Sequence, residues 1–193
     1  ERFSFLTHKG HSGSLTAPFF FDLSRFLDAG DLQRDGFIGP ETSNTLPGAD
    51  APVSGVEQLD FELADRRSSA LADALLDAWN QQDQSRHDSF NRWCKTQEWL
   101  EDHARFSVLH AQHQGPWWSW PSDLAHHNTN ALKSWSEEHA NELLRIKLQQ
   151  WHLDRQWQAI RDLARQRGVL LFGDLPFYVS ADSSDVWSHR NLF

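Results

Sequence analysis

Apolar residues recur at helical spacing over much of this 193-residue chain. The longest such pattern runs from Ala131 to Arg167, and its apolar face is wide enough to predict packing on two sides. Gly168 follows directly, as expected of a glycine that ends a helix. Another strong pattern starts at Ser89 and stops at Gly115-Pro116, which predicts a second long helix.

Shorter patterns predict two further helices and one strand. Arg67–Asn80 has apolar residues at helical spacing, Ser24–Leu32 suits a short helix, and Asp35–Gly55 is rich in loop-forming residues. Val169–Phe172 is a short, continuous apolar run, which is typical of a strand buried on both faces. The chain is therefore expected to be predominantly helical, with one buried strand near its end, which predicts an α/β fold with a parallel sheet.

The composition is unusually rich in large aromatic rings, with ten Trp and thirteen Phe against one Tyr and no Met. So many indole rings are costly to expose, so we expect most of them to be buried or to stack on a ligand. The missing Met and the start within a pattern, at Glu1, indicate a partial chain. We find no internal repeat.

Charge and cysteine content narrow the possible functions. The net charge of −9 without a cluster of Lys and Arg argues against a nucleic-acid partner. Cys94 is the only cysteine, so no intramolecular disulfide can form, and a reducing cytoplasm is the expected location. No apolar run reaches membrane-spanning length, and no leader sequence opens the chain, so we expect no membrane partner.

Asp174 is the most informative polar residue because it follows the predicted strand Val169–Phe172 almost at once. In barrels of parallel strands, residues at the carboxyl ends of the strands carry the chemistry. Asp174 could equally cap a following turn or helix. Spacing alone does not separate these two interpretations.

Three other groups have both a structural and a functional interpretation. Asp182-Ser183-Ser184-Asp185 could bind a cation, but a helix cap is favoured because a calcium loop needs more ligands. Four tryptophans are either core residues or platforms for sugar rings: Trp187 and the loop residues Trp117, Trp118 and Trp120. For the three loop rings, burial is favoured. His110-x-x-His113 and His126-His127 lack a cysteine partner and make a weak case for zinc.

The motifs of the last residues resemble a known family. Gly173-Asp-Leu-Pro-Phe-Tyr-Val179, Asp182-Ser-Ser-Asp-Val-Trp187 and Asn191-Leu-Phe193 are similar to the motifs of 4-α-glucanotransferases, glycoside hydrolase family seventy-seven. The resemblance continues upstream and covers most of residues 17–193. It includes the segments Trp99–Phe106, Trp118–Pro121, Gln156-Trp157, Arg165–Gly168 and Pro18–Leu32.

This resemblance implies a part of a (β/α)8 barrel with a large, mostly helical insertion. Residues 1–167 would hold an early barrel loop and the inserted helices, and residues 168–193 a barrel strand and the active-site loop. The implied reaction transfers an α-1,4-glucan segment between maltooligosaccharides by a retaining double displacement. Asp174, Asp185 and Trp187 would bind or support the substrate, with no metal or other cofactor.

The resemblance places the reacting groups outside this chain. The Arg-x-Asp of the nucleophile, the acid/base Glu and a His-Asp pair are expected beyond Phe193, and we expect none of them within the chain. The 193 residues alone would then be inactive. The alternative is a non-catalytic module that binds α-glucans or a protein partner through its helices; the oligomeric state stays open.

Overall fold

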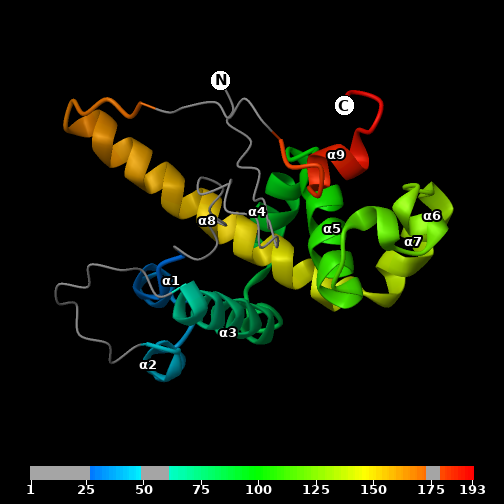
Figure 1. Ribbon diagram of the computed structural model, residues 1–193. Helices are drawn as coiled ribbons and strands as arrows, with labels where there is room; N and C mark the ends of the chain where they lie inside the picture. The colour runs from blue at the N-terminus through cyan, green and yellow to red at the C-terminus, as the bar shows by residue number, and fades with distance from the viewer. Residues whose placement is uncertain (1–26, 49–60, 173–178) are drawn as a thin grey trace. The chain divides into compact units, whose positions relative to one another are not determined.

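The computed structural model describes residues 27–48, 61–172 and 179–193, and all regular elements among these residues are helices. The chain divides into two compact units, each of which is described by itself. Unit 1 holds the described residues 96–147, 172 and 179–193, and unit 2 holds residues 27–48, 61–95 and 148–171. The longest helix, α8 (Ala140–Gln166), contributes residues to both units (Figure 1).

Unit 2 consists of five helical segments. They are α1 (Ala29–Arg34), α2 (Pro40–Thr45), α3 (Phe61–Trp79), α4 (Gln84–Lys95) and the later part of α8. Local sequence explains where several of them begin and end. Asp28 caps α1 by accepting a hydrogen bond from the Asp31 backbone N–H, and Pro40 occupies the first position of α2, where no backbone N–H is needed.

Aromatic rings form the centre of unit 2. Trp151 of α8 makes edge-on contacts with Phe37, Trp79 and Phe90, at centroid distances of 5.5–6.4 Å. All four rings are buried, and His152 lies edge-on to Phe37 at 4.3 Å. Such edge-to-face pairs add to the free energy gained from burying the rings. The apolar face of α8 predicted from the sequence therefore packs here.

Asp35, just after α1, ties three segments of unit 2 together. Its carboxylate lies 3.3 Å from a guanidinium nitrogen of Arg86 and 3.0 Å from one of Arg155. Partial burial opposes ionisation, but the hydrogen bond and charge of Arg155 and the charge of Arg86 outweigh it, so the pKa of Asp35 is below its usual value. The Gln156 side chain reinforces this link by bonding both the backbone N–H and the C=O of Asp28, each at 2.9 Å.

Unit 1 is built from short helices around α5 (Leu100–His113). A 3-10 turn η2 (Trp117–Ser119) and the helices α6 (Ser122–Ala125), α7 (Thr129–Glu138) and α9 (Ser184–Ser188) complete it, with the start of α8. Asn128 caps α7, because its side-chain oxygen accepts hydrogen bonds from the backbone N–H groups of Asn130 and Ala131. Helix α9 packs against α5 (Figure 1).

The structure confirms the longer predicted helices but divides two of them. The predicted helix Ser24–Leu32 overlaps α1 only at residues 29–32, and residues 24–26 lie outside the described residues. Arg67–Asn80 lies within α3 apart from its last residue. The pattern from Ser89 spans α4 and α5, with a turn over residues 96–99, and the pattern from Ala131 spans α7 and α8. The second break is at His139, the C-cap of α7, whose φ of −112° and ψ of 29° are not helical.

The expected α/β fold is wrong for the part of the chain that the structure describes. Val169–Phe172 follows α8 as irregular backbone with exposed side chains; Leu170 is 94% and Phe172 101% exposed. A strand requires a neighbouring strand to pair its N–H and C=O groups, and residues 27–48, 61–172 and 179–193 contain none. The helix stop itself is confirmed, because Gly168 has φ +68° and Gly168 and Val169 donate to carbonyls of the last helical turn.

The proposed division at residue 167/168 stays a prediction. No helix within the described ranges is long and apolar enough to cross a membrane.

His152 makes the stability of unit 2 depend on pH. Burial, followed by the charge of Arg155, lowers the pKa of His152 to about 3 from 6.5, while Asp35 acts in the opposite direction. The folded chain therefore keeps His152 neutral, and below pH 6.5 the unfolded chain binds a proton that the folded chain does not. This contribution to stability is complete above pH 6.5 and is lost progressively toward pH 3.

We predict that the free energy of unfolding of the wild-type chain falls between about pH 6.5 and pH 5 by up to about 1.4 kcal/mol per pH unit from this group. The variant His152→Gln should lack this part of the slope, and the exposed-site variant His126→Gln should keep it. Urea unfolding followed by circular dichroism at a series of pH values measures both. Equal slopes for His152→Gln and the wild type would contradict the assignment.

Candidate functional site

The sequence places its main functional candidate, Asp174, in residues 173–178, outside the described residues. The segment that follows, residues 179–193, is described and contains the other two candidates, Asp185 and Trp187. The site is therefore characterised by how this segment is held against α5 and η2 of the same unit.

The turn before α9 is a helix cap, as the favoured interpretation of Asp182–Asp185 predicts. Ser183 has extended backbone geometry, and its hydroxyl accepts a hydrogen bond from the Val186 backbone N–H at 3.3 Å. One turn later, the Ser188 hydroxyl donates to the Ser184 carbonyl at 2.7 Å. Both serines of the turn are buried. The run of small polar residues thus starts α9 in a confined space.

Asp182 joins α9 to two other elements through its two carboxylate oxygens. One oxygen lies 3.0 Å from Nε2 of His110 on α5, and the other accepts the backbone N–H of Trp117 at 3.2 Å. The His110 and Asp182 side chains are only 10% and 21% exposed. Because removal of a partly buried acceptor leaves its donors unsatisfied, this carboxylate is a principal tie of the segment.

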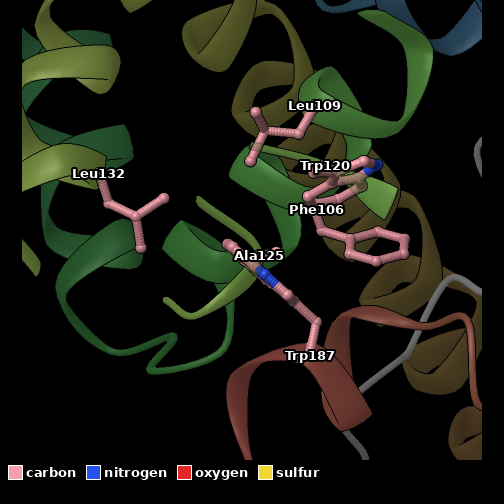
Figure 2. Packing of buried hydrophobic residues seen from close by; sticks show 6 residues of the cluster. All are labelled: Phe106, Leu109, Trp120, Ala125, Leu132 and Trp187. Atoms are coloured by element: carbon pink, nitrogen blue, oxygen red, sulfur yellow. The ribbon is translucent and has the colours of Figure 1, made fainter. Parts of the chain in front are cut away.

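Trp187 lies at the centre of unit 1. It is completely buried and belongs to a cluster of six core residues, shown in Figure 2: Phe106, Leu109, Trp120, Ala125, Leu132 and Trp187. Its indole N–H donates to the Leu124 carbonyl at 3.0 Å. In this arrangement the ring is not available to stack on a sugar, and any support that Trp187 gives to a substrate is indirect, through the position of α9.

Asp185 occupies the first turn of α9, where a negative charge suits the helix dipole. Its side chain is half-buried, and one carboxylate oxygen is inaccessible to solvent. The substrate-binding roles given to Asp174, Asp185 and Trp187 stay predictions.

The three tryptophans of the aromatic loop differ in exposure, so neither of the two interpretations that the sequence allows holds for all of them. Trp120 is buried in the cluster, and its indole N–H donates to the Gly115 carbonyl at 3.0 Å. Trp117 is half-buried, and its indole N–H donates to the Ala181 carbonyl at 2.7 Å. Trp118 is 56% exposed. The favoured burial of these rings therefore holds for Trp120 but not for Trp118.

The two histidine pairs do not act as pairs. His110 faces Asp182, whereas His113 is exposed and its ring lies 6.1 Å from the ring of Trp120. His126 contacts Ser122, and its neighbour His127 contacts Asp102. Within the described ranges, no three His, Cys, Asp or Glu side chains are arranged to hold a metal ion.

One partly buried contact between a carboxylate and basic side chains was missed from the sequence. Asp102 of α5 lies 3.0 Å from Nε2 of His127 and 3.2 Å from Arg105. Burial opposes ionisation of Asp102, but the hydrogen bond and charge of His127 and the charge of Arg105 prevail, so the pKa of Asp102 is below its usual value. His127 also packs edge-on to Trp187 at 4.6 Å and has φ +54°, a backbone conformation that no sequence pattern indicated.

The expectation that short catalytic patterns are absent needs one correction. Arg86-His87-Asp88 contains both Arg-x-Asp and His-Asp. These residues lie within α4, where Arg86 pairs with Asp35 and the exposed Asp88 accepts a hydrogen bond from Gln84. Their partners give them a structural role in unit 2.

The described carboxylates of the site, Asp182 and Asp102, connect elements of the fold and do not form a reacting pair. A retaining glycosidase needs two carboxyl groups about 5 to 5.5 Å apart, one of them free to attack. Asp182 is engaged by His110 and Trp117, and Asp102 by His127 and Arg105. The described part of the site can position a segment and present aromatic surface.

Comparison with known proteins identifies the class to which this arrangement belongs. The family described as 4-alpha-glucanotransferase, glycoside hydrolase family 77, matches residues 12–193. This chain belongs to that family.

Individual relatives carry the same description. A 4-alpha-glucanotransferase from Synechocystis sp. is 32% identical over 165 residues, which cover 84% of this chain and 32% of that protein. One from Thermus thermophilus is 38% identical over 96 residues, 49% of this chain and 19% of the relative. A chloroplastic/amyloplastic one from Solanum tuberosum is 32% identical over 107 residues, 55% of this chain and 19% of the relative. The chain thus spans a third or less of the length of these relatives.

We predict that Asp182→Ala lowers the free energy of unfolding by about 1 to 3 kcal/mol, because the Trp117 N–H and His110 lose their acceptor. The matched variant Asp123→Ala removes an exposed carboxylate of the same unit and should change it by less than about 0.5 kcal/mol. Urea unfolding followed by tryptophan fluorescence measures both. If the two variants were equally stable, Asp182 would not be a tie of this segment.

Proposed function

We propose that this chain is part of a 4-α-glucanotransferase that cuts an α-1,4 bond in a maltooligosaccharide or starch-type glucan and transfers the released segment to another glucan. The family match over residues 12–193 carries this proposal. The motif residues 173–193 supply its local support, since they resemble the family in sequence and include the anchored segment before and through α9.

The proposed reaction proceeds by two displacements with retention at the anomeric carbon. A carboxylate attacks that carbon while a carboxylic acid protonates the departing glycosidic oxygen, which gives a covalent glycosyl intermediate. A hydroxyl group of the acceptor glucan then attacks the intermediate, and the conjugate base of the acid takes its proton. The attacking and the acidic carboxyl groups belong to parts of the longer protein outside residues 1–193, so the chain alone performs no transfer.

Within this proposal Asp174 contacts the sugar at the cleavage point and supports its hydrogen bonds. Trp187 and Asp182 act on the site by fixing the segment after residue 178: Trp187 through its burial and Asp182 through His110 and Trp117. Asp185 at the start of α9 completes this support.

The net charge and the cysteine content of the chain support a substrate class and a location. An α-1,4-glucan is neutral, which agrees with a chain of net charge −9 that has no cationic cluster for a nucleic acid. We propose the cytoplasm as the location, on the basis of the single cysteine. The Solanum tuberosum relative, by contrast, carries the name chloroplastic/amyloplastic.

We predict that Asp174→Asn, placed in the longer protein that contains this chain, lowers the transfer rate at least about a hundredfold, by about 2.7 kcal/mol of transition-state stabilisation. The circular dichroism spectrum should stay unchanged. Release of glucose and longer maltodextrins from maltotriose measures transfer, with Asp123→Asn as the matched control. Wild-type transfer by Asp174→Asn would remove Asp174 from the site, and absence of transfer by the unaltered protein would refute the proposed function.

A further inference from the structure

One indole ring of this chain is exposed, whereas the others are buried or half-buried. All ten Trp residues lie within the described ranges, and Trp118 alone is exposed among them. Its side chain is 56% exposed, whereas Trp120, two residues later, is 4% exposed. Since an exposed indole ring is unfavourable in water, its surface is a candidate for a ligand contact.

Trp118 forms a corner with its neighbour Trp117. The two ring centroids are 5.4 Å apart, and the ring planes meet at 84°. We call these two side chains the tryptophan corner. A ring that lies flat on Trp118 would therefore meet Trp117 at its edge, and the corner is suited to one six-membered ring at a time.

The tryptophan corner is fixed in place before any ligand arrives. Residues Trp117–Ser119 form the 3-10 turn η2, which is closed by bonds from the Ser119 backbone N–H and hydroxyl to the Pro116 carbonyl, at 2.9 and 2.7 Å. Trp117 is held at two atoms, its backbone N–H by Asp182 and its indole N–H by the Ala181 carbonyl. Binding to such a surface costs little conformational entropy.

Polar groups lie beside the rings. The Arg190 guanidinium lies over the Trp117 ring, 5.3 Å from its centroid. Within the described part of the chain no carboxylate pairs with Arg190, so its N–H groups can donate to a ligand. The Ser119 hydroxyl, which donates to the Pro116 carbonyl, lies on the same turn and can accept a hydrogen bond. Hydroxyl groups of a ligand would find a donor and an acceptor here, and its apolar face would find an indole ring.

The size and chemistry of the corner favour a sugar over a protein. A specific protein interface buries about 800 Å² on each partner, whereas one indole ring offers on the order of 100 Å². A glucose ring has an apolar C–H face of that size and a rim of hydroxyl groups. It matches both features of the corner at once.

We propose that the tryptophan corner is an α-1,4-glucan subsite, in which a glucose ring stacks on Trp118 and Arg190 donates hydrogen bonds to its hydroxyl groups. The choice of an α-glucan rests on the proposed function. The subsite is tied through Trp117 to the segment that follows the Asp174 motif, and it engages a part of the glucan other than the bond that is cut.

Titration of the 193-residue chain with maltoheptaose tests this proposal, with the indole N–H signals observed by NMR. The signal of Trp118 is identified by its loss in Trp118→Tyr. We expect it to shift with saturation at millimolar sugar, and the signals of the buried Trp120 and Trp187 to stay in place. In the variants, which lack the Trp118 signal, binding is followed by the indole N–H signal of the neighbouring Trp117. Trp118→Ala should weaken binding at least about tenfold, a loss of about 1.4 kcal/mol. Trp118→Tyr, which keeps an aromatic face, should restore most of the affinity.

Ile160→Ala is the matched control, because it removes an apolar side chain of similar exposure, 52%, from the other unit and should bind as the wild type does. The β-1,4-linked cellohexaose should bind more weakly than maltoheptaose. The proposal is overturned if tens of millimolar maltoheptaose leave the Trp118 signal unmoved, or if Trp118→Ala binds maltoheptaose as the wild type does. It is also overturned if the Trp118 signal shifts only when a protein partner is added in place of the sugar.

The failure of this subsite and the failure of the proposed function give different results. Transfer from maltotriose by the longer protein, with the Trp118 signal unmoved by maltoheptaose, would overturn the subsite alone. A shifted Trp118 signal in a protein without transfer would overturn the function and leave a glucan-binding site. In an active protein, Trp118→Ala should raise KM for long glucans more than it raises KM for maltotriose.

Discussion

The arrangement of unit 1 depends on a single carboxylate, that of Asp182. Its two oxygens engage His110 of α5 and the backbone N–H of Trp117 in η2. One side chain thus holds the segment before α9 against two elements that lie 72 and 65 residues earlier in the sequence. Trp187 adds the apolar part of the same attachment, with its ring buried among Phe106 and Trp120. Short helices such as α9 have little stability of their own, and they persist only where tertiary contacts of this kind hold them.

This attachment explains why two adjacent indole rings have different environments. Trp117 is half-buried because its backbone N–H donates to Asp182 and its indole N–H donates to the Ala181 carbonyl. Trp120 directly follows the 3-10 turn and packs in the core, with its indole N–H bonded to the Gly115 carbonyl. Trp118, between them on a tight turn, is then directed outward. The surface proposed to receive a glucan is thus a consequence of how the motif segment is held.

Local patterns in the sequence predicted the helices and the cap before α9, because spacing, Gly168 and the serine turn act over a few residues. They did not predict the breaks at residues 96–99 and His139, where a turn and a non-helical backbone conformation interrupt continuous apolar patterns. Nor did they predict the Asp182–His110 and Asp102–His127 contacts, which join residues 72 and 25 positions apart. The apolar run Val169–Phe172 predicts a strand by its hydrophobicity alone, and hydrophobicity does not indicate whether a strand to pair with is present.

The central claim, that Asp182 and Trp187 fix the motif segment on α5, is tested most directly by hydrogen exchange of the unaltered chain. The backbone N–H groups of Trp117, Val186 and Trp187 are bonded in the folded state to Asp182, Ser183 and Ser183, respectively. The account predicts that all three exchange slowly, at rates similar to those of α5. Exchange at the rate of an unstructured peptide, with α5 still protected, would contradict it.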